Sequence, residues 1–297
     1  MNLTNIPTVN GNFTLNSTGS GILALSVSVN LYMSIPGNYT QTGGTFYPSN
    51  GSADDILYIG GNFNMSGGTL GGPPSGNGST TLIFNKNGVQ TYTYTAGQGS
   101  VTNKLHFQVN ANSILDVGSS IVGDPLYTKG NFTLYSGAGL KTANSSGITS
   151  SGASGSVQVF GSRYYDSNAN YTYYFSGAQT TGSGFPTSPT GTVTIGSSSN
   201  TTNLTFSSLT TINGTLVIVN GTVVNTNVSY ASGGTLEYQG TSGQTMGNNE
   251  WPSNTVPKLK INNSSGVAMN TGKTVSTTLY LTSGALSIGS GNTLTLN

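Results

Sequence analysis

Hydrophobic and polar residues alternate along much of the chain, most clearly in the run ILALSVSVNLYMSI at residues 22–35. A period of two predicts a β-strand with one apolar face. Similar shorter runs predict strands at 105–111, 215–224, 279–288 and 293–297, and no segment shows a helical period over a useful length. The apolar positions of the first run are Leu23, Leu25, Val27, Val29, Leu31, Met33 and Ile35.

A short motif recurs along the first half of the chain. It consists of Gly, Asn, an aromatic residue and a short alternation that runs into a glycine turn. The copies are GNFTLNSTGSG at 11–21, GNYTQTGGTF at 37–46, GNFNMSGGTL at 61–70 and GNFTLYSGAGL at 130–140. Repeats at irregular intervals favour a solenoid whose coils differ in their loops. With roughly 20 to 25 residues per coil, the chain would form about a dozen coils.

We therefore predict an all-β fold, a parallel β-helix that occupies residues 1–297 as a single domain. Tandem β-sandwiches are the alternative, because short strands separated by turn residues also predict that architecture.

A second unit contains the only tryptophan and two of the seven carboxylates. In LEYQGTSGQTMGNNEWP at 236–252, Glu237 and Glu250 lie near Trp251. Two acids beside an aromatic ring are one arrangement found in glycan-cleaving sites, where paired carboxyl groups act as acid and base.

A related segment favours a structural interpretation of this unit. YYFSGAQTTGSGFP at 173–186 aligns with it and places Phe185 at the position of Trp251, each followed by a proline. In this copy the two acids are replaced by Tyr174 and Gly184. We therefore interpret the unit as a repeated corner that buries an aromatic ring and fixes the chain direction with proline.

The composition argues against several classes of function. Only 5% of residues are charged, the net charge is +1, and the eight Lys and Arg are scattered, so a nucleic-acid partner is not expected. The absence of cysteine excludes disulfides, thiolate metal sites and cysteine nucleophiles. No apolar stretch has the length of a membrane span, and the first residues do not resemble a signal peptide, so membrane insertion is not expected.

The segments GTLEYQGTSGQT at 234–245 and PKLKINNSSGVAMNTGKTVSTTLYLTSGALSIGSGNTLTLN at 257–297, with the recurring GNFT units, resemble the repeat regions of long secreted surface proteins of Bacteroidetes and Chlorobi bacteria. The resemblance is clearest over 234–297. It implies a right-handed parallel β-helix, export by the type IX secretion system, and a fragment of a larger extracellular protein. It implies no catalytic residues.

Asp54 and Asp55 in NGSADDILYIGG are the only adjacent carboxylates. With nearby carbonyl groups they form a candidate calcium site, because Ca²⁺ prefers several oxygen ligands, and a solvated loop is the alternative. Calcium is the only cofactor that the sequence suggests. His106 is the sole histidine and has no cysteine or second histidine with which to form a zinc site.

Tyrosines cluster after one of the few arginines, in RYYD and NANYTYYF. An exposed row of tyrosines on a solenoid can stack on sugar rings, although an aromatic ladder inside or along the coil, or a loop packed on it, is the commoner use of such a cluster. The candidate glycan contacts are Arg163, Tyr164, Tyr165, Tyr171 and Tyr173.

The pattern as a whole favours a non-catalytic structural or adhesive module at the cell surface or outside the cell: a stalk, a spacer or a filament component. The candidate partners are extracellular polysaccharide and other copies of the chain, bound end to end through unpaired backbone groups. The alternative is a carbohydrate-binding or polysaccharide-degrading β-helix protein. An enzyme is not expected, because seven scattered acids, such as Asp116, Asp124 and Asp166, would have to be brought together by folding.

Asn-X-Ser/Thr triplets, at Asn12, Asn38, Asn131 and Asn170 among others, are acceptors of N-linked glycans only in a host that glycosylates such sites.

Overall fold

The computed structural model describes residues 9–72, 77–95, 99–124 and 128–297. The chain is a parallel β-solenoid of about 11 turns. Its contacts form two compact units, Met1–Asn144 with Ile148–Asp166 and Ser145–Gly147 with Ser167–Asn297, here called unit 1 and unit 2. A single domain over 1–297 remains a prediction, and each unit is described by itself.

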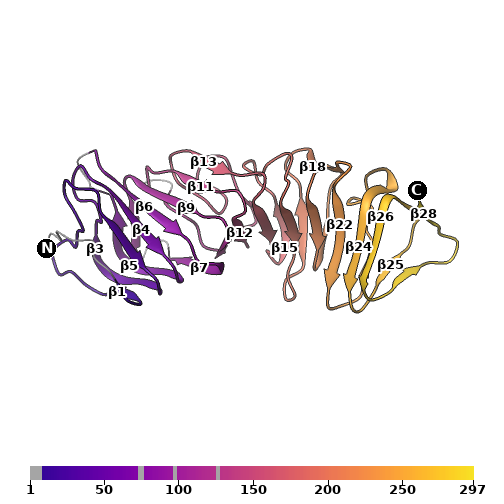
Figure 1. Ribbon diagram of the computed structural model, residues 1–297, viewed down its shortest axis with the longest axis horizontal. Coiled ribbons are helices and arrows are strands. Elements are labelled where there is room, and N and C mark those ends of the chain that lie inside the picture. Colours follow the sequence, from indigo (N-terminus) through magenta and orange to yellow (C-terminus); the bar gives the residue numbers. More distant parts are fainter. Residues whose placement is uncertain (1–8, 73–76, 96–98, 125–127) are drawn as a thin grey trace. The chain divides into compact units, whose positions relative to one another are not determined.

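Unit 1 contains two parallel sheets. The first has the order β1 (Phe13–Leu15), β3 (Tyr39–Phe46), β5 (Phe63–Gly71), β7 (Gly88–Tyr94), β10 (Ser113–Gly118) and β12 (Gly139–Thr142), and β8 (Gly99–Thr102) also pairs with β5. The second has the order β2 (Tyr32–Ile35), β4 (Asp54–Ile59), β6 (Ser79–Phe84), β9 (Leu105–Val109), β11 (Phe132–Leu134) and β13 (Arg163–Tyr165). Figure 1 shows β3 and β5 side by side and, likewise, β4, β6 and β9.

Unit 2 contains one long sheet and three short ones. The long sheet has the order β14 (Asn170–Tyr173), β16 (Thr192–Ile195), β19 (Thr215–Ile218), β22 (Thr235–Gly240), β24 (Thr255–Asn263), β26 (Lys273–Ser283) and β28 (Leu294–Leu296). The short sheets are β15 (Gly177–Thr180), β17 (Thr202–Thr205) and β20 (Gly221–Val223); β18 (Thr210–Ile212) and β21 (Val228–Tyr230); and β23 (Gln244–Thr245), β25 (Val267–Met269) and β27 (Leu286–Ile288). One 3-10 turn, η1, spans Pro252–Asn254.

The strand pairs recorded within each unit are parallel, as β3 with β5 and β22 with β24 illustrate. Parallel neighbours from successive coils produce the solenoid, whereas β-sandwiches pair their strands antiparallel. The alternative of tandem β-sandwiches is therefore wrong.

The core of unit 1 follows from the aromatic residue of the repeated motif. Phe13, Tyr39 and Phe63 are register partners on successive strands, and Tyr92 continues the row. The rings of Tyr39 and Phe63 stack at 4.9 Å between centroids, and those of Phe63 and Tyr92 at 4.7 Å. These distances match the spacing of neighbouring strands, about 4.8 Å. The fourth motif copy differs, because its Phe132 lies in the second sheet, where it partners Phe107.

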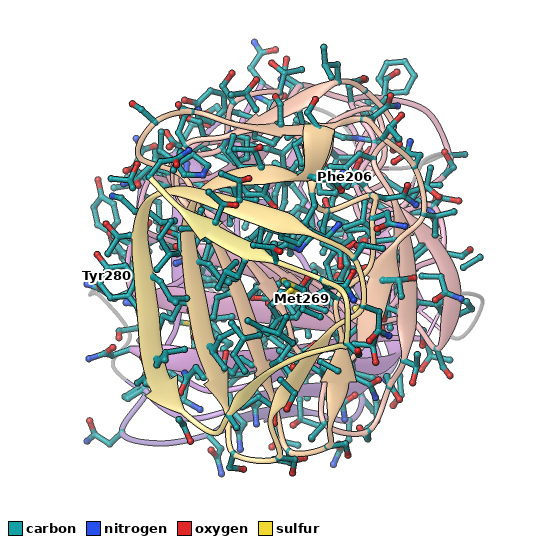
Figure 2. The ribbon with its side chains drawn as sticks, turned by 90° about the vertical axis from the view of Figure 1, so that its right-hand side faces the viewer. Phe206, Met269 and Tyr280 are labelled. Atoms are coloured by element: carbon teal, nitrogen blue, oxygen red, sulfur yellow. The ribbon has the colours of Figure 1, made fainter. Side chains whose placement is uncertain are left out.

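Unit 2 is filled in the same way by aliphatic side chains. Val193, Leu216, Leu236 and Leu259 form one inward row, in register from β16 to β24. Figure 2 shows the contrast between inside and outside: Met269 lies within the coil and is fully buried, whereas Tyr280 of β26 points outward and is 46% exposed. Phe206, also labelled there, is fully buried.

The strand predicted over 22–35 is much shorter in the structure, because only Tyr32–Ile35 forms β2. The carboxylate of Asp55 accepts hydrogen bonds from the Ser26 hydroxyl at 2.9 Å and from the Leu31 backbone N–H at 2.7 Å. These bonds hold the chain in a bend, and Val27 and Val29 are exposed instead of buried. The runs predicted at 215–224 and 279–288 are each divided between two strands.

Candidate functional sites

The corner around Trp251 is closed by hydrogen bonds between buried side chains. The indole Nε1 of Trp251 donates to the hydroxyl oxygen of Tyr238 at 2.9 Å. That hydroxyl in turn donates to Oε1 of Glu250, also at 2.9 Å. All three side chains are at most 3% exposed. Burial and the nearby carboxylate of Glu250 raise the pKa of Tyr238 well above its usual value, so the hydroxyl remains a donor.

Glu250 is held in this corner by backbone groups as well. The Gly247 N–H donates to Oε1 at 2.6 Å, and the Tyr230 hydroxyl donates to the Glu250 backbone carbonyl at 3.0 Å. A Cβ at Gly247 would overlap the Glu250 carboxylate, so a larger residue there would displace this side chain. Oε2 of Glu250 is buried and has no hydrogen-bond partner among the residues that the structure describes. The corner is thus a packed hydrogen-bonded cluster.

Lys273 belongs to the same corner, although the sequence did not single it out. Its ammonium group donates to the Oδ1 atoms of Asn248 and Asn254, each at 3.0 Å, and lies 5.5 Å from the centre of the Trp251 ring. Only 2% of the residue is exposed. The strand period could have identified Lys273, because it lies two residues before Val275 and therefore on the same face of β26. Both residues are buried.

Glu237 lies in β22, and its side chain points to the outer face of that strand. Glu250 lies on the inner side of the same strand, where Tyr238 bonds it. Successive side chains of a strand point to opposite faces, and Tyr238, the residue that bonds Glu250, points inward. Glu237 forms an ion pair with Lys260 at 3.2 Å and accepts a hydrogen bond from Asn262 at 2.9 Å. The two acids therefore do not face one another across a common site.

The corner near Phe185, which aligns with the corner near Trp251, has the predicted arrangement of a buried aromatic ring followed by a proline. Phe185 is 7% exposed and contacts Tyr171 and Tyr173 edge to face, with ring centres 5.2 and 5.8 Å apart. The Tyr173 hydroxyl donates to the Thr181 carbonyl at 3.0 Å. Both copies thus bury an aromatic ring before a proline, and the interpretation as a repeated corner is confirmed for these residues.

The predicted row of exposed tyrosines is mostly buried. Tyr171 and Tyr173 in unit 2 are each 1% exposed, and Tyr165 in unit 1 is 9% exposed. These three rings cannot reach a ligand at the surface, so assigning them as glycan contacts was wrong. Tyr164 is the exception, because it is 55% exposed and its hydroxyl donates to Asp166 at 3.1 Å.

Arg163 is a structural side chain in this structure. Its guanidinium donates to the carbonyl of Val159 at 2.9 Å, to the Thr149 hydroxyl at 2.7 Å and to the carbonyl of Gly152. These bonds hold the connection between β12 and β13 against β13. A guanidinium with its donors engaged in this way is poorly placed to contact a sugar.

The candidate calcium pair also divides between two faces. Asp54 and Asp55 are consecutive in β4; Asp54 is exposed and accepts from the Ser79 hydroxyl at 2.7 Å, whereas Asp55 is fully buried. Burial raises the pKa of Asp55, and the hydrogen bonds from Leu31 and Ser26 oppose that rise. Because adjacent strand residues point to opposite faces, the two carboxylates cannot bind one ion together. The predicted site is not formed.

His106 takes part in a backbone contact between coils. Its Nδ1 accepts a hydrogen bond from the backbone N–H of Asn131 at 3.1 Å. Burial lowers the pKa of the imidazole, the charge of Asp54 opposes this effect, and the charge of Lys104 adds to it. His106 is therefore a neutral acceptor in the fold.

Asparagine side chains form a similar row along the first sheet of unit 1. Asn12 Oδ1 accepts from the Asn38 backbone N–H, and Asn38 Oδ1 accepts from the Asn62 backbone N–H, both at 2.8 Å. Asn62 Oδ1 then accepts from the Thr91 backbone N–H at 3.0 Å. The asparagine of the repeated motif therefore connects each coil to the next, which we call the asparagine ladder.

Two further kinds of feature are absent from the described part of the chain. No group of three or more His, Cys, Asp or Glu side chains is placed to hold a metal ion. No helix there has the length and apolar character needed to cross a membrane. Asp116 is paired with Lys141 at 2.9 Å.

Comparison with known proteins finds no matching family, no matching characterised protein and no matching solved structure. The resemblance to secreted surface proteins of Bacteroidetes and Chlorobi therefore remains a prediction.

Proposed function

We propose that the chain is a non-catalytic structural module, a spacer or stalk segment of a larger extracellular or cell-surface protein. The observation that carries the proposal is the asparagine ladder. It joins coil to coil through Asn12, Asn38 and Asn62, alongside the stacked rings of Tyr39 and Phe63. Contacts that repeat from coil to coil make each coil the support of the next.

The distribution of charged groups supports this proposal. The acids that would be needed for glycan hydrolysis are engaged separately, Glu250 in the corner and Glu237 with Lys260 on the outer face. A surface made mostly of Ser, Thr, Asn and Gly, with 5% charged residues, suits a stable extracellular spacer.

Limited proteolysis tests the structural role. We expect the native chain to resist thermolysin, and the double variant Asn38→Ala, Asn62→Ala to be cut faster, because it loses two acceptors of the ladder. Asn64→Ala is the matched control, since Asn64 lies exposed on β5 outside the ladder. Rapid cleavage of the native chain within its coils would contradict the proposal.

Two further measurements test the remaining parts of the proposal. Antibody labelling of intact cells checks the surface location. Incubation with a panel of polysaccharides, followed by an assay for new reducing ends, checks the absence of hydrolysis. Reducing ends that are lost in Glu250→Gln, in Glu237→Gln or in a variant of another acid would show that the chain is an enzyme, whereas ends that every such variant still releases would indicate a contaminating enzyme.

A further inference from the structure

The outer face of the second sheet of unit 1 carries aromatic and aliphatic side chains. The inward positions of this sheet are filled by a row that includes Leu57, Leu82 and Phe107. The residue after each of these points outward. The outward residues are in register across the sheet and form a row that we call the tyrosine row: Ser34, Tyr58, Ile83, Gln108, Thr133 and Tyr164.

A second outward row lies next to the tyrosine row. It contains Tyr32, Ile56, Thr81 and His106, also in register. Tyr32 is 46% exposed and Tyr164 is 55% exposed, Ile56, Tyr58, Gln108 and Thr133 are partly exposed, and Ile83, between Tyr58 and Gln108, is 7% exposed. The two rows thus combine aromatic rings with hydroxyl and amide groups on the outer face of one sheet, whose strands β4, β6 and β9 lie side by side in Figure 1.

The charge of this face decides which class of ligand it fits. Neither row contains a carboxylate, an ammonium or a guanidinium group. His106 accepts a hydrogen bond at Nδ1, and burial lowers the pKa of its ring, so it is neutral near pH 7. Three charged groups stand at the margin of the face: Asp54 accepts from Ser79, Lys104 donates to the Asn77 carbonyl, and Asp166 accepts from the Tyr164 hydroxyl. The two rows thus offer no cluster of cations to phosphate groups or acidic sugars.

We propose that this face binds a neutral polysaccharide lying along the tyrosine row. Tyrosine offers an apolar ring for the face of a sugar and a hydroxyl for its edge, while Gln108 and Thr133 offer hydrogen bonds to sugar hydroxyl groups. Tyr58 and Tyr164 are four strands apart, which corresponds to roughly 19 Å at a strand spacing of about 4.8 Å. An extended glycan of several units spans that distance. The inference adds an adhesive surface to the proposed structural role.

Binding to soluble and insoluble polysaccharides tests the proposal on the full chain. The panel contains neutral glycans, such as cellulose, xylan, mannan and β-1,3-glucan, and acidic ones, such as alginate and polygalacturonate. We expect binding to at least one neutral glycan, with little dependence on salt. The double variant Tyr58→Ala, Tyr164→Ala should weaken it about tenfold or more, because each ring contributes a stacking contact.

Two controls keep the result specific. Tyr280→Ala removes an exposed tyrosine from unit 2 and should leave binding unchanged. Tyr58→Phe retains the ring and should retain most of the binding, and Gln108→Ala probes the same row in case the double variant does not fold. Thermal unfolding of each variant reports on the fold.

Failure of every neutral glycan to bind would overturn the proposal, as would equal binding by the native chain and the folded double variant. Preference for the acidic glycans, or binding abolished by moderate salt, would also overturn it. None of these results would affect the protease resistance that tests the structural role.

Discussion

The hydroxyl of Tyr238 donates a hydrogen bond to Oε1 of Glu250 at 2.9 Å. The same hydroxyl oxygen accepts the indole N–H of Trp251, so one phenol group satisfies two neighbours inside the corner. Both neighbours are almost fully buried and cannot turn to water instead. This one oxygen atom therefore makes two of the hydrogen bonds that hold the corner together.

Replacement of Tyr238 by Phe should destabilise the chain by about 1–3 kcal/mol, because the Trp251 N–H is left without an acceptor and Glu250 loses a donor. Urea unfolding followed by tryptophan fluorescence measures the change, since Trp251 is the only tryptophan. Tyr280→Phe, at an exposed site, should change stability by less than about 0.5 kcal/mol. Equal effects of the two substitutions would contradict this account of the corner.

The bond from the Asn131 N–H to His106 predicts a loss of stability at mildly acidic pH. The folded pKa of His106 is lowered from 6.5, so the unfolded chain takes up the proton more readily than the folded chain. The contribution of neutral His106 to the free energy of unfolding is complete above the pKa of the histidine in the unfolded chain. It is lost as the pH falls below that pKa. The check is the free energy of unfolding at pH 7.5 and pH 5.5, about one unit either side of that value.

His106→Asn is the control for this pH effect, because an asparagine side chain accepts a backbone N–H at the equivalent step of the asparagine ladder. This variant should lose less stability between the two pH values than the native chain. A native chain whose stability changes no more than that of His106→Asn over this interval would exclude the histidine as the cause.

Two glycines allow the cost of backbone strain to be distinguished from the cost of close packing between coils when alanine replaces glycine. Gly196 and Gly291 have φ values of +79° and +78°, so alanine is similarly strained at both. A Cβ at Gly196 would overlap the carbonyl oxygen of Asn220, whereas a Cβ at Gly291 meets nothing within 4 Å. Gly196→Ala should therefore lower the melting temperature clearly more than Gly291→Ala. Equal shifts would show that conformational strain alone sets the cost.

The stacked rings of unit 1 should make a large contribution to its stability. Phe63 is fully buried between Tyr39 and Tyr92, so Phe63→Ala removes two stacked ring contacts and an edge-to-face contact with Phe84, and leaves a cavity. We expect a loss of about 3–5 kcal/mol. Phe63→Tyr keeps the ring and should cost much less, since Tyr39 and Tyr92 are already tyrosines in the row. A small effect of Phe63→Ala in thermal unfolding would contradict the stacking argument.

The division of Asp54 and Asp55 between two faces predicts unequal effects of their replacement. Asp55→Ala leaves the Leu31 N–H and the Ser26 hydroxyl without their acceptor and should cost about 1–3 kcal/mol. Asp54→Ala, at an exposed position, should cost less than about 0.5 kcal/mol. Melting curves in calcium and in EDTA should coincide, and a rise in the melting temperature with calcium that Asp54→Ala abolishes would restore the predicted site.

The sequence predicted the solenoid because its signal is local. Alternation at 105–111 predicted a strand, which Leu105–Val109 confirms, and the recurrence of the motif predicted stacked coils, in which its aromatic residue forms the stack at Tyr39. The strand over 22–35 failed for a different reason. The bend between Ser26 and Leu31 is held by Asp55, a residue of the next coil that a local period does not include.

The tyrosine site was misplaced because it was predicted from tyrosines that are close in sequence. Which face of a strand each one occupies depends on whether its position is odd or even along the strand. In Arg163–Tyr165 the alternation puts Tyr164 outside and Tyr165 inside, and in Asn170–Tyr173 it puts both tyrosines inside. The partners of Tyr164 in the tyrosine row come from earlier coils, and Tyr58 is the nearest tyrosine among them. Only the register of the sheet brings these residues onto one face.

The asparagine ladder also bears on how such a chain changes in evolution. Asn38 gives its N–H to the coil before and offers Oδ1 to the coil after, and Asn62 does the same. A duplicated or deleted coil therefore leaves the same donor and acceptor at the junction that were there before. Genes encoding chains of this kind are free to grow or shrink by whole turns, so length can be selected without redesigning the interior.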